Sequence, residues 1–164
     1  MRRLVSAYEH AVAVLSGRVA ESIALLATRT ALAGIFWRSG RSKVVDGSVL
    51  EISDATRHLF EYEYVGVPLP PEIAAVLSTY AEHFLPILLI VGLGTRFAAL
   101  GLWCMTMVIQ IFVFPEAWWS VHLLWAALAA VLISRGGGLF ALDVAIARGL
   151  PGTSRSPQPM AQPG

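Results

Sequence analysis

The fold is decided by residues 97–134, FAALGLWCMTMVIQIFVFPEAWWSVHLLWAALAAVLIS, in which Glu116 is the only charged residue. A helix needs roughly 20 apolar residues to cross the hydrocarbon core of a bilayer. Residues 97–115 and 117–134 each come close to that length, and Glu116 lies in the connection between them. The stretch therefore predicts two antiparallel transmembrane helices joined by a tight turn.

Two further segments qualify as membrane spans if one charge is accepted in each. Residues 22–37 are apolar apart from Arg29 and two threonines, and residues 73–95 are apolar apart from Glu82 and the adjacent His83. An all-α, integral membrane four-helix bundle follows, with helices at about residues 22–38, 73–95, 97–115 and 117–135.

Composition supports a membrane protein and excludes several other classes. The chain is 56% hydrophobic and 14% charged, whereas soluble domains have about a quarter charged residues. Its net charge of +1 and the absence of a basic stripe with interleaved aromatics argue against nucleic-acid binding. Cys104 is the single cysteine, so an intrachain disulfide, a C-x-x-C redox pair and a cysteine-rich zinc site are all excluded.

Basic residues on the two sides predict the orientation, because cytoplasmic loops are enriched in Lys and Arg. With the N-terminus inside, the inner side has seven: Arg2, Arg3, Arg18, Arg96, Arg135, Arg148 and Arg155. The outer side has four: Arg38, Arg41, Lys43 and Arg57. The difference favours two cytoplasmic termini and an extracytoplasmic first loop.

The segments before and after the spans differ in composition, and each predicts a different structure. Residues 1–20 are expected to be a cytoplasmic segment and not a secretory signal, because the apolar run at 11–15 is too short. Residues 21–150 form the membrane domain, which ends in an amphipathic segment at 139–150. Residues 151–164 are rich in Pro, Ser, Gly and Gln and are predicted to be disordered.

The first loop, at about residues 39–71, is long for a connection without a function of its own. Its aromatic residues Phe60, Tyr62 and Tyr64 suit the membrane interface. Two roles remain open for them, packing at the interface and capping a partner or ligand.

Arg29 and Glu82 require an explanation, because a charge inside a bilayer costs several kcal/mol. Counted from the inner boundary at about 1.5 Å per residue, Glu82 lies ~21 Å deep and Arg29 ~14 Å deep. We therefore predict a direct or water-bridged ion pair between them. Pro86 removes the helical partner of the Glu82 carbonyl, which predicts a kink there. With Ser78 and Thr79 nearby, the group is either a structural salt bridge or a ligand or proton site.

Three other polar residues lie within the spans. His83 and His122 are at matching depths on different helices and could ligate haem in principle. Two isolated histidines are weak evidence, so ordinary hydrogen bonding between helices is favoured for both and for Gln110. No metal site is predicted, and no nucleophile elbow, P-loop or nucleotide fingerprint is present. Whether the chain is an enzyme is therefore left undecided.

Several of these motifs, in this order, resemble the DoxX family of small bacterial membrane proteins. They cover roughly residues 22–148 and include Arg29-x4-Gly34-x-Phe36-x3-Gly40-x2-Lys43, Glu82-x3-Pro86, residues 88–96, residues 105–115, His122-Leu-Leu-Trp125, Arg135-Gly-Gly-Gly138 and Leu142-Asp143. The first loop also resembles a common subfamily at Phe60, residues 63–64, Val67-Pro68 and Pro70-Pro71. Gly137 and Ala141 depart from the family pattern, which often has a proline and a serine at those places.

The resemblance implies a four-helix bundle in the bacterial inner membrane, with Arg29, Lys43 and Glu82 as its characteristic polar cluster. It also implies an accessory, non-catalytic membrane subunit of a redox or oxidative/thiol-stress system, with a soluble or membrane-bound redox partner. The alternatives are a quinone-binding subunit of a thiosulfate:quinone oxidoreductase type and a small-molecule carrier. Quinone is the cofactor to consider first, and the chain could also form a homo-oligomer.

Overall fold

A computed structural model of the chain describes residues 1–149, so the predicted tail at 151–164 lies outside the described part. The described residues are mostly helical, in the order α1 (Arg2–Leu15), α2 (Arg18–Ser42), α3 (Asp54–Tyr62), α4 (Pro71–Val91), α5 (Thr95–Phe112), α6 (Leu123–Arg135) and α7 (Leu142–Gly149). A 3₁₀ turn (Pro115–Ala117) and a π-helical turn (Trp118–His122) join α5 to α6.

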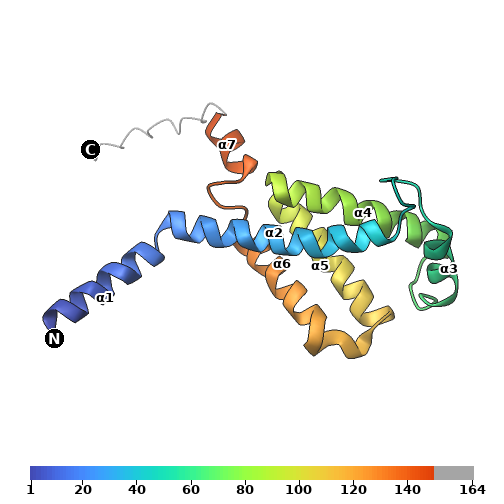
Figure 1. The fold of residues 1–164 in the computed structure, drawn as a ribbon, viewed down its shortest axis with the longest axis horizontal. Coiled ribbons are helices and arrows are strands. Elements are labelled where there is room, and N and C mark those ends of the chain that lie inside the picture. Colours follow the sequence, from blue (N-terminus) through green and yellow to red (C-terminus); the bar gives the residue numbers. More distant parts are fainter. Residues whose placement is uncertain (150–164) are drawn as a thin grey trace, which may run out of the picture.

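The predicted all-α membrane bundle is confirmed. Four segments are long and apolar enough to cross a membrane: α2, α4, α5 and the helical stretch Pro115–Arg135 that ends with α6. Helix α2 packs against α4 and α6, and α5 packs against the same two helices (Figure 1). The four spans therefore form an antiparallel bundle in which α2 and α5 are diagonal to each other, and the α5–α6 hairpin diverges from α2 and α4 toward its connecting turn (Figure 1).

We name the two ends of this bundle for what they contain. The loop end is where α2 ends, α4 begins and α3 lies (Figure 1). The closing end is where α2 begins, α4 ends and α5 begins, and it includes the glycine turn at residues 136–138. Helix α1 extends from the closing end, away from the bundle (Figure 1).

The helix ends differ from the predicted ones for local reasons. Helix α2 begins at Arg18 and not at residue 22. Its first turn contains the charged residues Arg18 and Glu21, which lie beyond the apolar part of the span, so hydropathy did not include them. Helix α4 ends at Val91 and not at residue 95, because Gly92 and Gly94 have positive φ angles of 76° and 58°. Left-handed glycines commonly terminate helices.

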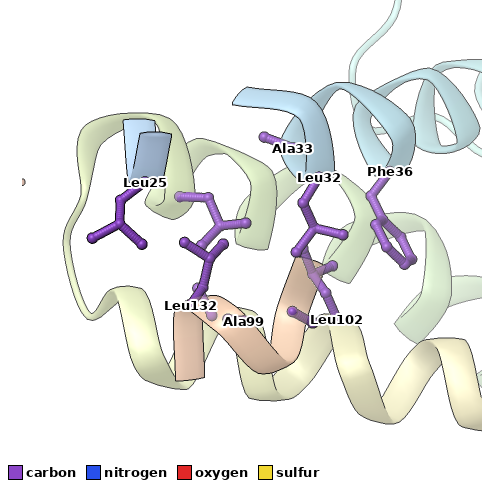
Figure 2. Packing of buried hydrophobic residues seen from close by; sticks show 10 residues of the cluster. Leu25, Leu32, Ala33, Phe36, Ala99, Leu102 and Leu132 are labelled. Atoms are coloured by element: carbon purple, nitrogen blue, oxygen red, sulfur yellow. The ribbon is translucent and has the colours of Figure 1, made fainter. Parts of the chain in front are cut away.

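The core lies between α2, α4, α5 and α6. Leu32 of α2, Leu102 of α5 and Leu132 of α6 have 0% of their surface exposed and belong to one buried cluster (Figure 2). Alanines such as Ala99 and Ala129 fill the remaining positions, so the helices approach closely. Small residues serve this purpose in membrane bundles, where packing replaces the hydrophobic effect between helices.

The first loop is more ordered than its sequence indicated. It contains α3, whose N-cap Ser53 accepts a hydrogen bond from the Thr56 backbone N–H, and an isolated bridge between Val44 and Ile52. Phe60 of α3 packs against the first turns of α4. The loop is therefore fixed on the loop end of the bundle.

Candidate functional site

Lys43 and Glu82 form a buried ion pair at the loop end of the bundle. The Lys43 Nζ atom lies 2.6 Å from Glu82 Oε2, and the two residues are 8% and 1% exposed. The same ammonium group donates to the Ser39 hydroxyl at 2.9 Å, one turn earlier on α2. Two helices that are distant in sequence thus share one polar contact at membrane depth.

The direction of helical side chains explains this pairing. Side chains lean toward the N-terminus of their own helix. Lys43 at the end of α2 therefore leans back into the bundle, whereas Glu82 in the antiparallel α4 leans toward the loop end. The two side chains converge.

The predicted ion pair between Arg29 and Glu82 is wrong for the same reason. Arg29 lies on α2 like Lys43, but it is closer to the closing end, and its side chain leans further toward that end. The two backbone depths were within reach of an arginine side chain, but the two side chains diverge.

Arg29 instead donates to backbone carbonyl groups at the closing end. Its Nε atom lies 2.6 Å from the Leu89 oxygen, and its Nη2 atom lies 2.7 Å from the Ile90 oxygen. Its Nη1 atom donates to the oxygens of Gly137 at 3.1 Å and Phe140 at 3.4 Å. The first two carbonyls belong to the last turn of α4 and lack helical donors, and a cation is favourable at that end of a helix dipole. Arg29 therefore caps α4 and ties it to the glycine turn.

Asp143 of α7 performs the complementary role for α5. Its carboxylate accepts hydrogen bonds from the backbone N–H groups of Gly94 at 2.7 Å and Thr95 at 2.9 Å. Burial alone would raise the pKa of Asp143, but these N–H groups and the charge of Arg29 outweigh it and lower the pKa. The resemblance included Asp143 only as part of a closing motif, and its role as a helix cap was not predicted.

Glycines at the closing end are required by close packing. Gly92 has a φ of 76°, and a Cβ atom there would lie 2.6 Å from both the Ala141 Cα and the Arg29 Nη2 atoms. A Cβ atom on Gly137 would lie 2.4 Å from the Ala141 Cβ. Gly137 and Ala141, the two departures from the family pattern, are therefore in direct contact with each other.

A cavity of about 430 Å³ lies beside the ion pair, between α2, α4, α5 and the π-helical turn. Its wall is mostly apolar, with Met105, Val108 and Ile109 among its residues. Polar atoms interrupt this wall at a few positions: Ser39, Lys43, Tyr64, Ser78, Glu82 and His122. Ligand sites commonly combine such an apolar wall with a few polar groups.

The first loop covers one side of this cavity. Phe60, Tyr64 and Val67 line it, and Tyr64 stacks edge-on against Phe60 and Phe114 with centroids 5.0 and 6.0 Å apart. Burial, followed by the charges of Glu82 and Glu63, raises the pKa of the Tyr64 phenol, so the phenol stays protonated at neutral pH.

His122 has a defined tautomer. The Gln110 Nε2 atom lies 2.6 Å from the Pro115 oxygen, which can only accept, so the amide nitrogen must face it. The Gln110 Oε1 atom then faces His122 Nδ1 at 2.7 Å, which must donate. In the neutral ring the His122 Nε2 atom is then a hydrogen-bond acceptor, and no partner for it is found within the described residues. His122 is also one of the residues that line the cavity.

The other predicted site residues divide into two sets. Ser78 lines the cavity and donates to the Ala75 oxygen at 3.2 Å. Thr79 and His83 do not line it: His83 Nδ1 contacts the Thr79 oxygen at 2.7 Å, and the ring packs against Gly40, where a Cβ atom would lie 2.9 Å away. The structure thus places His122 at the cavity and His83 at the α2–α4 contact. Within the described residues, no group of three or more His, Cys, Asp or Glu side chains could hold a metal ion.

Pro86 lies inside α4, which continues through it to Val91. Cys104 lines the cavity and was not predicted as a site residue, because a single cysteine in an apolar run carries no local signal. Tyr64, which also lines the cavity, belongs to the loop aromatics for which packing at the interface and capping of a partner or ligand were both left open.

The arrangement defines a class: a multi-pass membrane bundle with a buried Lys–Glu pair beside a partly covered cavity between its helices. Comparison with protein families then gives a specific match, to the DoxX family model over residues 24–115. This range is more than half of the 164-residue chain, and it contains Arg29, Lys43 and Glu82. The chain belongs to the DoxX family. No curated protein and no solved structure gives a significant match.

Proposed function

We propose that this chain is an accessory membrane subunit of a redox system that binds a quinone-type molecule in the internal cavity. One observation carries the proposal, a mostly apolar cavity of about 430 Å³ whose wall is interrupted by the Lys43–Glu82 pair. A buried ion pair that only held helices together would not need a cavity beside it. The size is within the usual range of small-molecule sites, roughly 300–1,000 Å³.

The polar atoms of the cavity suit the two oxidation states of a quinone. Glu82 Oε1 and, in the neutral ring, His122 Nε2 offer acceptors to a hydroxyl group. Lys43, whose ammonium group donates to Glu82 Oε2 and Ser39, would turn one of these donors to a carbonyl oxygen. A quinone has carbonyl oxygens and a quinol has hydroxyl groups at opposite sides of one ring. The apolar residues around them suit an isoprenoid chain.

The remaining parts of the proposal concern the setting of the protein. We place the chain in the bacterial inner membrane with both termini in the cytoplasm, supported by seven basic residues on that side against four. A soluble or membrane-bound partner would perform the redox chemistry, consistent with the lack of a catalytic motif in the sequence. Homo-oligomerisation remains a secondary proposal.

The test is purification in mild detergent, followed by solvent extraction and mass spectrometry for quinones. A short-chain quinone should also raise the melting temperature of the quinone-free protein. Ala81→Phe places an aromatic ring in the cavity wall, so we expect it to abolish both effects. Ala127→Phe is the matched control, because Ala127 is exposed on the outer face of α6.

The outcomes separate the alternatives. Loss of quinone in Ala81→Phe with retention in Ala127→Phe supports the proposal. No co-purified quinone and no thermal shift in the folded wild-type protein would contradict it. Equal loss of quinone from both variants would also contradict it, because quinone would then be bound to the lipid-exposed surface of the helices and not in the cavity. Co-purification of another apolar compound, with flux into proteoliposomes, would favour the carrier alternative.

A further inference from the structure

A second hollow lies at the closing end of the bundle, away from the proposed quinone cavity. It has a volume of about 610 Å³ and lies between the start of α2, the start of α5, the glycine turn and α7. Four arginines line it: Arg18, Arg96, Arg135 and Arg148. We call it the arginine groove.

Its positive charge is only partly neutralised. Of its two carboxylates, Glu21 lies 3.0 Å from Arg135 Nη1, and Asp143 accepts from the backbone N–H groups that begin α5. Within residues 1–149, Arg18, Arg96 and Arg148 have no carboxylate within salt-bridge distance. The groove thus has a surplus of cations without anions of its own.

Arg96 is held in place before any ligand arrives. Its Nη1 atom donates to the Ile133 oxygen at 2.6 Å and the Ser134 oxygen at 2.9 Å, near the end of α6. Its Nε and Nη2 atoms lie beside Gly136, 3.5 and 3.7 Å from where a Cβ atom would be. A fixed guanidinium loses little conformational freedom on binding, and its planar N–H groups match the oxygens of a phosphate.

An apolar surface adjoins the charged one. Phe97, in the first turn of α5, lines the groove and is 82% exposed. The groove lies where the spans α2, α5 and α6 begin or end, which is the level of lipid head groups in a bilayer. A soluble anion would use the arginines but not this aromatic surface.

We propose that the arginine groove binds the phosphodiester head group of an anionic glycerophospholipid, with its acyl chains against Phe97. The site is independent of the proposed quinone cavity, which is at the loop end. Basic pockets between membrane helices are suited to such head groups, because the phosphate meets several cations at the bilayer surface.

The experiment measures lipid binding to the delipidated full-length protein in mild detergent by native mass spectrometry and thermal shift. The probes are phosphatidylglycerol, phosphatidylcholine and inorganic phosphate. The test variant is Arg18→Gln with Arg148→Gln, because neither side chain makes a hydrogen bond within the described residues. Arg38→Gln with Arg57→Gln is the matched control, since it removes two exposed arginines at the opposite end.

We expect phosphatidylglycerol to bind the wild-type protein and the control with similar affinity, and the test variant about twentyfold more weakly. Raising the salt concentration should weaken the binding to the wild-type protein, which tests the electrostatic origin without any substitution. Phosphatidylcholine should bind more weakly in every case.

Three results would overturn the proposal. Equal binding of phosphatidylcholine and phosphatidylglycerol to the wild-type protein would remove the role of charge. An equal loss in the control variant would indicate an effect of overall charge and not of the groove. The same thermal shift with inorganic phosphate would identify the groove as a site for a soluble anion.

Discussion

The two ends of the bundle use buried basic residues in different ways. At the closing end, Arg29 donates to four backbone carbonyls and has 0% of its surface exposed. At the loop end, Lys43 donates to Glu82 Oε2 and to Ser39, and it borders a cavity. The acceptors of Arg29 are all backbone carbonyls of the protein, whereas Glu82 accepts through Oε2 alone within the described residues, which leaves its other oxygen for a ligand. A charge within a span therefore indicates a ligand site only where one of its polar atoms has no partner in the protein.

The largest expected effect comes from Arg29→Met. This substitution leaves four carbonyl groups at the closing end without a donor, each costing about 1–3 kcal/mol when buried. We therefore expect a loss of roughly 4 kcal/mol or more, seen as a large fall in melting temperature and in the yield of monodisperse protein. Arg38→Met removes an exposed arginine from the same helix and should change little. If the two variants melted alike, the capping role of Arg29 would be refuted.

Glu82→Gln should have the next largest effect on stability. It leaves the Lys43 ammonium group buried without a counter-charge, which costs about 3 kcal/mol. The double variant Lys43→Met with Glu82→Met removes both charges, so thermal unfolding should show most of the stability recovered. This recovery should not extend to quinone binding.

The double variant thus separates the two roles of the pair. If it were stable and still bound quinone as the wild-type protein does, the pair would be structural only. If it remained as unstable as Glu82→Gln, the cost of the unpaired lysine would not be the cause.

Asp143→Asn should have the smallest effect, about 1 kcal/mol, because it weakens one helix cap. The pKa of Asp143 is lowered in the folded protein, so its contribution is present above the unfolded pKa and is lost as the pH falls through the lower folded value. Melting temperatures from pH 7 down to about pH 3 should therefore fall more for the wild-type protein than for Asp143→Asn. If the melting temperatures of the two proteins fell equally with pH, the capping role of Asp143 would be contradicted.

Hydropathy was sufficient to predict the four spans, because each is a long apolar run that lipid can surround. The contacts of Arg29 were not predictable in the same way. Its acceptors at Leu89 and Gly137 are backbone atoms 60 and 108 residues distant, and any residue type supplies a carbonyl. The Lys43–Glu82 pair required side-chain direction as well as depth. Helix α3 had a local signal in the N-cap Ser53, which was not used.

The cavity could not have been found from the sequence, because it is a space left between helices. Its residues come from α2, α4, α5, the first loop and the π-helical turn, and most are ordinary apolar residues. The polar positions Ser78, Glu82 and His122 were selected as candidates, but so were Thr79 and His83, which face elsewhere. Helical position alone does not distinguish these faces without the neighbouring helices.

The bonds of Arg29 also constrain the order in which the chain can assemble. Arg29 is in the first span, whereas two of its four acceptors, at Gly137 and Phe140, lie just after the last span, 108 and 111 residues after Arg29. A nascent chain is synthesised from the N-terminus, so the guanidinium enters the membrane long before these carbonyls exist. Until then it has at most the acceptors at Leu89 and Ile90. The final packing of α2 therefore awaits the glycine turn, and a chain truncated before Gly137 would keep its first span incompletely bonded.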